Sequence, residues 1–343
     1  MDSTGDNILY AVWKANENTA YKVEFYCEQT DGAYTLEKTE PRTGTTDATV
    51  SVTDTDKGYG TPTYVYDAAN ANNVESGTVK ADGSLTLKLY FKRNTAGYTI
   101  HHYLKGTEVK VAPDQTGTMT IGDTLTASAS TALGAEYTSA HANSYSPSQS
   151  LKMKATGNVI TVYYTVPLTI TAESASRAYN AQPLTQPDFK VEGLVNGDQK
   201  KDITLSMTKE STITNVGSVQ NVIDTTTVRF KGGELPGGYY ELPTYQPGTL
   251  TITADATEVV VTITGNHNTL VYNGSKHSVK GYTTDVGEKT ITVALKEGSK
   301  AEAKGMNAGK YDMGLTEEDF TVTSQNYSNI KVVVVDGYLK IDP

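Results

Sequence analysis

Two pairs of similar strand sequences recur along this chain, and they constrain its fold more than any other feature. Residues 248–252 (Gly-Thr-Leu-Thr-Ile) and 337–341 (Gly-Tyr-Leu-Lys-Ile) each end a segment of about 90 residues. Upstream, residues 87–91 (Leu-Lys-Leu-Tyr-Phe) and 160–164 (Ile-Thr-Val-Tyr-Tyr) form a second pair. Related segments repeated along a sequence are typical of tandem modules. The sequence therefore predicts a row of small modules instead of one large domain.

Composition and periodicity both favour β-strands in these modules. The chain has 23 Tyr against 5 Phe and 1 Trp, and Thr is abundant throughout. Such residues suit pleated, half-exposed surfaces, where a tyrosine ring packs while its hydroxyl stays hydrated. Tyr21, Val23, Phe25 and Cys27 alternate with polar residues, and residues 85–91 do the same. We predict an all-β chain with at most short helices, arranged as an elongated tandem array.

Turn signals between the strand patterns place the borders of four modules, at residues 18–96, 97–166, 167–255 and 256–343. Residues 1–17 are expected to be the end strand of a preceding repeat or a remnant of the expressed fragment. The strand in question is residues 7–13 (Asn-Ile-Leu-Tyr-Ala-Val-Trp). The third and fourth modules share an internal spacing, because a Thr-Ile-Thr strand precedes Tyr179 and Tyr272 at the same distance. They diverge between residues 280 and 304, where different loops are expected.

Helical structure is expected at two places at most. Residues 126–150 are polar and weakly periodic, and the sequence leaves open whether they form a short helix or a long loop. Residues 315–320 contain Thr316 and Asp319 at the spacing of a capping box, which predicts a single helical turn. A strand is expected to follow at residues 321–323.

Charge and cysteine usage exclude several classes of function. The formal net charge is −10 and no basic cluster is present, which argues against nucleic-acid binding and against anionic membranes. No apolar run reaches the length of a membrane span. Cys27 is the sole cysteine, so we expect no internal disulfide and a small buried side chain. The first residues do not resemble a signal peptide, and we expect a piece excised from a longer protein.

No metal, cofactor or catalytic constellation is predicted. His101 and His102 are strand neighbours and should point to opposite faces, whereas His141, His267 and His277 lack partners at ligand spacing. Asp54 and Asp56 begin a segment similar to a calcium loop, but its twelfth position is Val65 where a glutamate is needed, so a solvated turn is expected. No nucleophile elbow or phosphate loop is present. We expect no enzyme and no cofactor.

The tyrosines are the candidate ligand contacts. Exposed rings such as those expected at Tyr145, Tyr239 and Tyr240 could stack on sugar faces. The alternative is that these tyrosines pack across strands, as strand residues do. A Lys–Asn isopeptide crosslink in place of disulfides is also left open, because its geometry is not visible in a sequence. No ligand-binding residue is assigned.

The first two modules resemble the mucin-binding (MucBP-type) and internalin B-repeat group. The residues that carry the resemblance are 21–26 and 98–103, the Thr-Gly-Thr-Thr at 43–46, Gly-Tyr at 58–59 and the strand at 87–91. The resemblance implies β-grasp-like modules repeated along the surface proteins of Gram-positive bacteria. Residues 9–13 are similar to the end of a Listeria–Bacteroides-type repeat.

The last two modules resemble the MBG/YDG-type repeats of bacterial adhesins. The matching segments are residues 178–180, 194–198 and 245–252 in the third module and 271–274, 307–311 and 326–341 in the fourth. A β-sandwich and a β-grasp-like topology both remain open for them. The resemblances together imply a secreted, cell-surface adhesin fragment, attached to the cell wall through a region outside this piece.

Such a fragment would bind host or environmental glycoprotein, with mucin-like glycans as ligands, through many weak contacts. The alternative is a stalk that binds nothing and projects another domain from the cell wall. Both hypotheses expect a monomeric rod with no nucleic-acid partner and no membrane insertion. A groove or an exposed aromatic patch on one module would distinguish the adhesin from the stalk.

Overall fold

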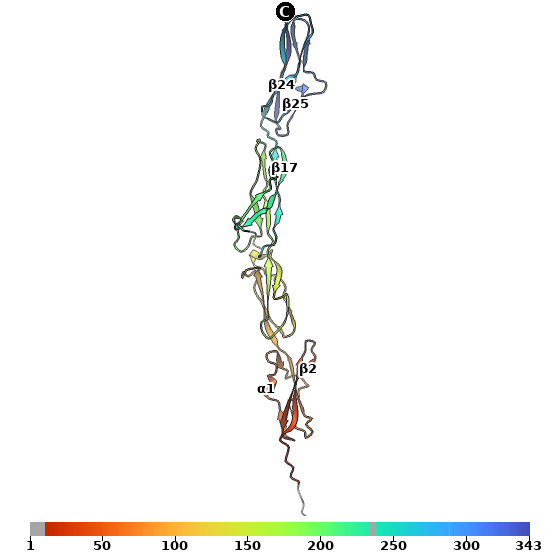
Figure 1. Cartoon of the computed structure of the whole chain (residues 1–343), viewed down its shortest axis with the longest axis vertical. Helices are drawn as coiled ribbons and strands as arrows, with labels where there is room; N and C mark the ends of the chain where they lie inside the picture. Colours follow the sequence, from red (N-terminus) through yellow and green to blue (C-terminus); the bar gives the residue numbers. More distant parts are fainter. Residues whose placement is uncertain (1–10, 234–237, 288) are drawn as a thin grey trace, which may run out of the picture. The chain divides into compact units, whose positions relative to one another are not determined.

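The computed structural model describes residues 11–233, 238–287 and 289–343. These residues are almost entirely strands joined by turns, which confirms the all-β prediction (Figure 1). The chain divides into two compact units, Met1–Val166 and Pro167–Pro343. Among the described residues, no helix has the length and hydropathy needed to cross a membrane.

The first unit contains the same arrangement of strands twice. One four-stranded sheet has the order β2 (Tyr34–Gly44), β1 (Thr19–Glu28), β6 (Thr86–Arg93) and β4 (Tyr64–Tyr66). The other has the order β8 (Gln115–Thr120), β7 (Thr95–Leu104), β12 (Val159–Thr165) and β10 (His141–Ser146). In each sheet the two central strands, β1 with β6 and β7 with β12, are parallel, and the outer pairs are antiparallel.

Each of these sheets is accompanied by a short strand pair and a short helix. The pairs are β3 (Thr49–Ser51) with β5 (Ser76–Thr78), and β9 (Thr124–Thr126) with β11 (Ser150–Lys152). The helices are α1 (Asp54–Lys57) and the 3₁₀ turn η1 (Ala135–Tyr137). The segment 126–150 therefore holds a helical turn and also strand β10, which its polar sequence did not indicate.

The core of the first sheet lies on the face that the sequence predicts. Val23, Cys27, Leu87, Leu89 and Phe91 are all fully buried in one cluster. Strand β1 meets β6 in parallel register, with Val23 opposite Leu87 and Cys27 opposite Phe91. Burial raises the pKa of the Cys27 thiol to about 11, so this side chain is a protonated apolar residue at neutral pH, as predicted.

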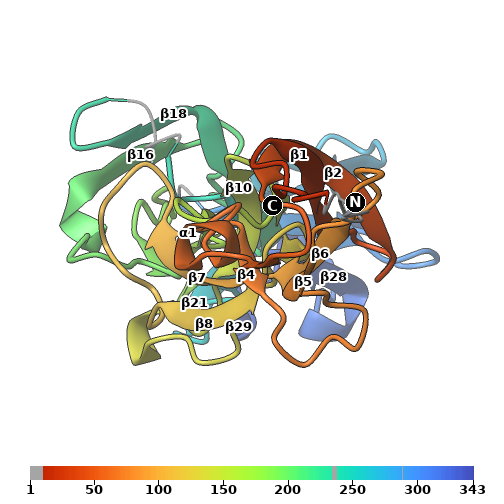
Figure 2. The same ribbon diagram turned by 90° about the horizontal axis from the view of Figure 1, so that it is seen from below.

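The second unit also repeats one arrangement, which differs from that of the first unit. Its first half has three-stranded sheets β15 (Phe189–Glu192), β13 (Thr169–Ala172), β19 (Thr244–Gln246) and β14 (Ala175–Ala178), β20 (Gly248–Thr253), β17 (Gly217–Asn221). Strands β16 (Ile203–Met207) and β18 (Ile223–Phe230) form a further antiparallel pair, which Figure 2 shows side by side, and η2 (Lys200–Asp202) precedes β16.

The second half of this unit has the same two three-stranded sheets. They are β24 (Tyr282–Asp285), β21 (Val259–Gly265), β29 (Ile330–Val335) and β22 (His267–Val271), β30 (Tyr338–Asp342), β27 (Gly309–Asp312). Strands β25 (Thr292–Leu295) and β28 (Phe320–Thr323) pair as β16 and β18 do. The predicted single turn is present as η3 (Glu317–Asp319), with the Thr316 and Asp319 capping box in place.

One strand pair distinguishes the two halves of the second unit. Strands β23 (His277–Lys280) and β26 (Glu302–Gly305) pair over four residues, whereas the described part of the first half has an isolated bridge between Leu184 and Ile213 in the corresponding place. The extra pair lies at both ends of the segment in which the two sequences diverge. The two halves therefore differ in structure around residues 280–304, where their sequences diverge, by this additional strand pair.

The glycine that begins each repeated pentapeptide stands where two backbones meet. A Cβ atom on Gly248 would lie 2.5 Å from the carbonyl oxygen of Glu173 and 2.6 Å from that of Ala172. A Cβ atom on Gly337 would lie 2.6 Å from the carbonyl oxygen of Asn266. Only glycine allows this approach, because the neighbouring atoms belong to the backbone and cannot turn aside as a side chain can.

The expected strand at residues 7–13 falls largely on residues 1–10, which lie outside the described residues. Residues 11–13 have no regular structure, and Val12 and Trp13 are more than nine-tenths exposed, at 92% and 91%. The described part of this segment is therefore not a strand.

Candidate functional site

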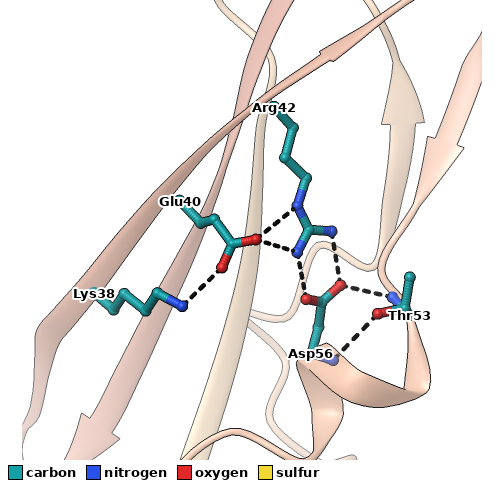
Figure 3. A network of polar contacts seen from close by, with 5 residues as sticks. All are labelled: Lys38, Glu40, Arg42, Thr53 and Asp56. Atoms are coloured by element: carbon teal, nitrogen blue, oxygen red, sulfur yellow. Dashed lines mark hydrogen bonds and ion pairs between the residues drawn. The ribbon is translucent and has the colours of Figure 1, made fainter.

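The predicted solvated turn at residues 54–58 is instead a capped helix that carries a buried ion pair (Figure 3). Arg42 of β2 donates to both carboxylate oxygens of Asp56, at 2.5 Å to Oδ1 and 2.9 Å to Oδ2. Asp56 also accepts from the backbone N–H of Thr53 at 2.7 Å and is only 4% exposed. The hydrogen bonds from Arg42 lower the pKa of Asp56 to about 2.

This network occupies the carboxylate that a cation would need. Glu40 accepts from the same guanidinium at 2.8 Å and from Lys38 at 2.7 Å, so the charges of the cluster are matched among themselves (Figure 3). The expectation of a solvated turn was wrong because Arg42 precedes Asp56 by fourteen residues and reaches it only in the folded sheet. Among the residues that the structure describes, no three His, Cys, Asp or Glu side chains are grouped to hold a metal ion.

His101 and His102 point to opposite faces of β7, as predicted. His102 is fully buried, whereas His101 is half-buried with its Nδ1 atom 3.1 Å from Asp114. The backbone N–H of Ser130 donates to the hydroxyl oxygen of Tyr164 at 2.7 Å, and the same hydroxyl forms a hydrogen bond with Nδ1 of His102 at 2.9 Å. Nε2 of His102 is a buried atom with no hydrogen-bond partner in the described structure.

This buried imidazole makes the stability of the first unit depend on pH. Burial lowers the pKa of His102 in the folded state, so the unfolded chain takes up a proton first as the pH falls below about 6.5. We expect the free energy of unfolding to fall by about 1 kcal/mol per pH unit below that value. Urea unfolding of the chain between pH 7.5 and 5 measures it. The variant His102→Phe should lose this part of the dependence, and an unchanged slope would contradict the assignment.

Two of the remaining histidines, His277 and His267, each contact one neighbouring side chain. His277 Nε2 lies 2.8 Å from the Asn273 side-chain oxygen, and His267 stacks on Tyr338 with ring centroids 5.3 Å apart. The Lys–Asn geometry that a crosslink would need is approached by Lys105, which donates to Asn143 at 2.9 Å on the exposed surface.

The tyrosines expected to be exposed are not free ligand contacts. Tyr240 is buried, and its hydroxyl lies 3.0 Å from both the backbone nitrogen of Val195 and Oδ2 of Asp198. Tyr239 donates to the same carboxylate at 2.6 Å and is half-buried, as is Tyr145 in β10. Burial raises the pKa of Tyr240, which keeps its hydroxyl protonated. These rings anchor a loop, so the expectation of exposure was wrong for Tyr240.

An open hollow of about 700 Å³ lies in the second unit, where the Asn215 loop meets the ends of β25 and β28. We call it the junction hollow. Its lining is rich in amide and hydroxyl groups and consists of Asn215, Lys289, Thr290, Ile291, Thr292, Thr323, Ser324, Gln325 and Asn326. The described lining residues include one ammonium group, that of Lys289, and no carboxylate.

Asn326 fixes the shape of the junction hollow. This side chain is 2% exposed, and its amide nitrogen donates to Thr290 at 2.9 Å and to Asn215 at 3.2 Å. Its oxygen accepts from the backbone N–H of Val216 at 3.0 Å, and Gln325 donates to the carbonyl of Val216 at 2.9 Å. A buried amide with every group satisfied holds the surrounding segments in one geometry.

The wall of the hollow presents groups that suit a polar, uncharged ligand. Thr292 and Thr323 are directly opposite each other in the β25–β28 pair, and both are exposed. Hydroxyl groups can donate and accept, and Lys289 adds a charged donor at the rim. The arrangement can hydrogen-bond a hydroxyl-rich molecule, and none of its described lining residues is a carboxylate or a histidine. Sequence analysis missed it because its residues come from three separate segments and form no motif.

No protein-family model matches the chain, and no curated protein matches it. Among solved structures, the chain is similar to the type 2 repeat of the mucus binding protein MUB from Lactobacillus reuteri, with 16% identity over 43% of this chain and 98% of that one, at a TM-score of 0.17. The Mub-RV crystal structure gives 17% identity, coverage of 43% and 97%, and a TM-score of 0.18. The Bacillus anthracis TIE protein is 8% identical over 68% of this chain and 51% of that one, at a TM-score of 0.26. TM-scores this low do not establish a common fold.

Proposed function

We propose that this chain is a segment of an extracellular bacterial adhesin that attaches to mucin-like glycoproteins through several weak, non-covalent contacts. The observation that carries the proposal is the junction hollow, an open surface lined by amide and hydroxyl side chains. Such groups can pair with the hydroxyls of a sugar, and the geometry of the hollow is already fixed by the hydrogen bonds of Asn326. The proposal assigns the chain no catalytic step and no cofactor.

Repetition of the modules supports a multivalent mode of attachment. Each unit holds its strand arrangement twice, so a parent protein with further copies would present many similar surfaces. Linked weak sites bind a polymer of repeated glycans far more tightly than one site does. We place the parent protein on the surface of a Gram-positive bacterium, attached to the cell wall, with MBG-type repeats in the second unit.

A stalk that binds nothing is the second candidate, and one observation favours it. The two halves of the second unit are joined by hydrogen bonds from and to the side chain of Asn326. They are also joined by an edge-to-face contact of Tyr179 with Tyr327, whose ring centroids are 5.5 Å apart. Fixed junctions are what a spacer needs to hold another domain away from a surface.

Binding to mucin and to a glycan array decides between these two functions. The full chain is applied alongside the double variant Thr292→Val/Thr323→Val, which keeps the β-branched shape of both strand residues but removes their hydroxyls. We expect its affinity to fall about tenfold or more, since each lost hydrogen bond contributes about 1 kcal/mol. The matched control is Thr321→Val, on the same strand and outside the hollow.

Equal binding by the double variant and the wild type would remove the junction hollow as the binding site. If the wild type binds no glycan and no mucin, the adhesin proposal fails and the stalk becomes the preferred function. Unfolding curves of all three proteins should coincide within about 1 kcal/mol, because the substitutions lie on the surface.

A further inference from the structure

A second hollow, of about 380 Å³, lies at the end of the β23–β26 pair in the second unit. It is lined by Lys276, His277, Ser278, Lys304, Gly305 and Met306, and we call it the lysine hollow. We propose that it binds the sulfate or carboxylate group of an acidic saccharide. The proposal rests on the adhesin function and names a ligand class for a site separate from the junction hollow.

The lysine hollow exists because the second half of this unit has a strand pair that the first half lacks. His277 is opposite Gly305 and Ser278 is opposite Lys304 in the antiparallel register of β23 and β26. Among the described residues of the first half, the corresponding place has a single bridge between Leu184 and Ile213. The extra pair therefore presents two lysines and a histidine at one end, where the repeated framework alone would not.

The glycine in the lining of the hollow is packed against an aromatic ring. A Cβ atom on Gly305 would overlap the ring of Tyr311, so this ring covers the glycine backbone directly. The hydroxyl of Tyr311 donates to the carbonyl of Asn307 at 3.0 Å, which fixes the turn that follows β26. Met306, in that turn, is 43% exposed and gives the hollow an apolar surface. A ligand with an apolar body beside its charged group would fit this combination.

The charge of the lining has one sign. Its two lysines carry that charge and none of the described lining residues is a carboxylate, although the chain as a whole has a net charge of −10. Lys304 lies 2.7 Å from Glu302, which also pairs with Lys280 at 3.2 Å. Among the described residues, no carboxylate lies within salt-bridge distance of Lys276. This ammonium is therefore available to an anion.

The surrounding charge and the size of the hollow point to a small acidic group instead of a polyanion. A nucleic acid or an anionic membrane would meet the repulsion of the acidic chain along its whole length. A single sulfate or carboxylate on a sugar meets only the local lysines, and a hollow of this volume accommodates one or two sugar rings. Charge-assisted hydrogen bonds to an ammonium are the stronger kind available to such a ligand.

Calorimetric titration of the full chain with sulfated lactose, with its unsulfated parent and with inorganic sulfate tests the proposal. An oligosaccharide that ends in glucuronic acid tests the carboxylate form. We expect the sulfated sugar to bind about tenfold or more tightly than lactose, and the preference to shrink as sodium chloride is added. The double variant Lys276→Gln/Lys304→Gln should lose the preference. The control Lys280→Gln changes a lysine of β23 that contacts Glu302 but lies outside the hollow.

Equal affinity for sulfated and unsulfated lactose, or undiminished binding by the double variant, would overturn the proposal. Binding of inorganic sulfate as tight as that of the sulfated sugar would overturn the saccharide part of it. The variant Thr292→Val/Thr323→Val separates the two sites, because it should keep the preference for sulfated lactose. If neutral glycans bind through the junction hollow and no charge preference appears, only this inference fails. If no saccharide binds at all, the proposed function fails with it.

Discussion

A single added methyl group at Gly248 is expected to destabilise the unit Pro167–Pro343 by about 3 kcal/mol. In Gly248→Ala, the new Cβ atom would have to lie 2.5 Å from the carbonyl oxygen of Glu173 and 2.6 Å from that of Ala172. Neither oxygen can rotate away, so two adjoining strands must separate and lose packing around the buried Leu250. Urea unfolding followed by circular dichroism measures the shift in the midpoint of this unit.

The matched control is Gly233→Ala in the same unit. The nearest atom to its added methyl group would be 3.7 Å away, and its backbone needs no left-handed conformation. This variant should unfold within about 0.5 kcal/mol of the wild type. Similar losses from the two substitutions would show that the crowded backbone at Gly248 is not the reason for the glycine in the repeated pentapeptide.

Replacing the buried carboxylate of Asp56 by an amide is expected to destabilise the first unit by about 3 kcal/mol, because Arg42 then keeps its charge but loses its buried carboxylate partner and retains only the more exposed Glu40. The variant Asp56→Asn is compared with Glu40→Gln, which removes the more exposed partner of the same guanidinium. The control should lose less than about 1 kcal/mol. Equal losses would contradict the view that Asp56 is the essential partner.

The difference in the free energy of unfolding between Asp56→Asn and the wild type should also depend on pH, because the Asp56 carboxyl group titrates. Arg42 lowers that pKa to about 2 in the folded state, from an ordinary value of 3.8. The ionised group therefore stabilises the fold above its ordinary pKa, and this contribution is lost as the pH falls through about 2. Unfolding curves recorded at pH 7, 3 and below 2 should show the two proteins converging only in the last.

The alternation of side chains along β1 and β6 was enough to predict which face is buried, because period two leaves only one face for Val23 and Leu87. The repeated pentapeptides likewise predicted that two segments share one arrangement of strands. The pentapeptide sequences could not show why each begins with glycine. The carbonyl groups that exclude a side chain at Gly248 and Gly337 belong to residues more than seventy positions away.

The polar sites were harder to predict for the same physical reason. Arg42 and Asp56, or Tyr240 and Asp198, are brought together by the sheets and not by local spacing, so a solvated turn and an exposed ring were the natural expectations. The junction hollow depends on Asn326, whose buried amide joins segments more than one hundred residues apart. A sequence shows the donors and acceptors but not the partners that satisfy them.

The parallel pairing of strands near the two ends of each repeat has a mechanical consequence. In the first sheet, β1 enters and β6 leaves side by side in the same direction, and β7 with β12, β13 with β19 and β21 with β29 repeat the pattern. Tension along the chain pulls such neighbours in opposite senses along their common axis. The hydrogen bonds between them then bear the load together in shear. In a hairpin pulled apart from its open end, by contrast, the hydrogen bonds open one after another.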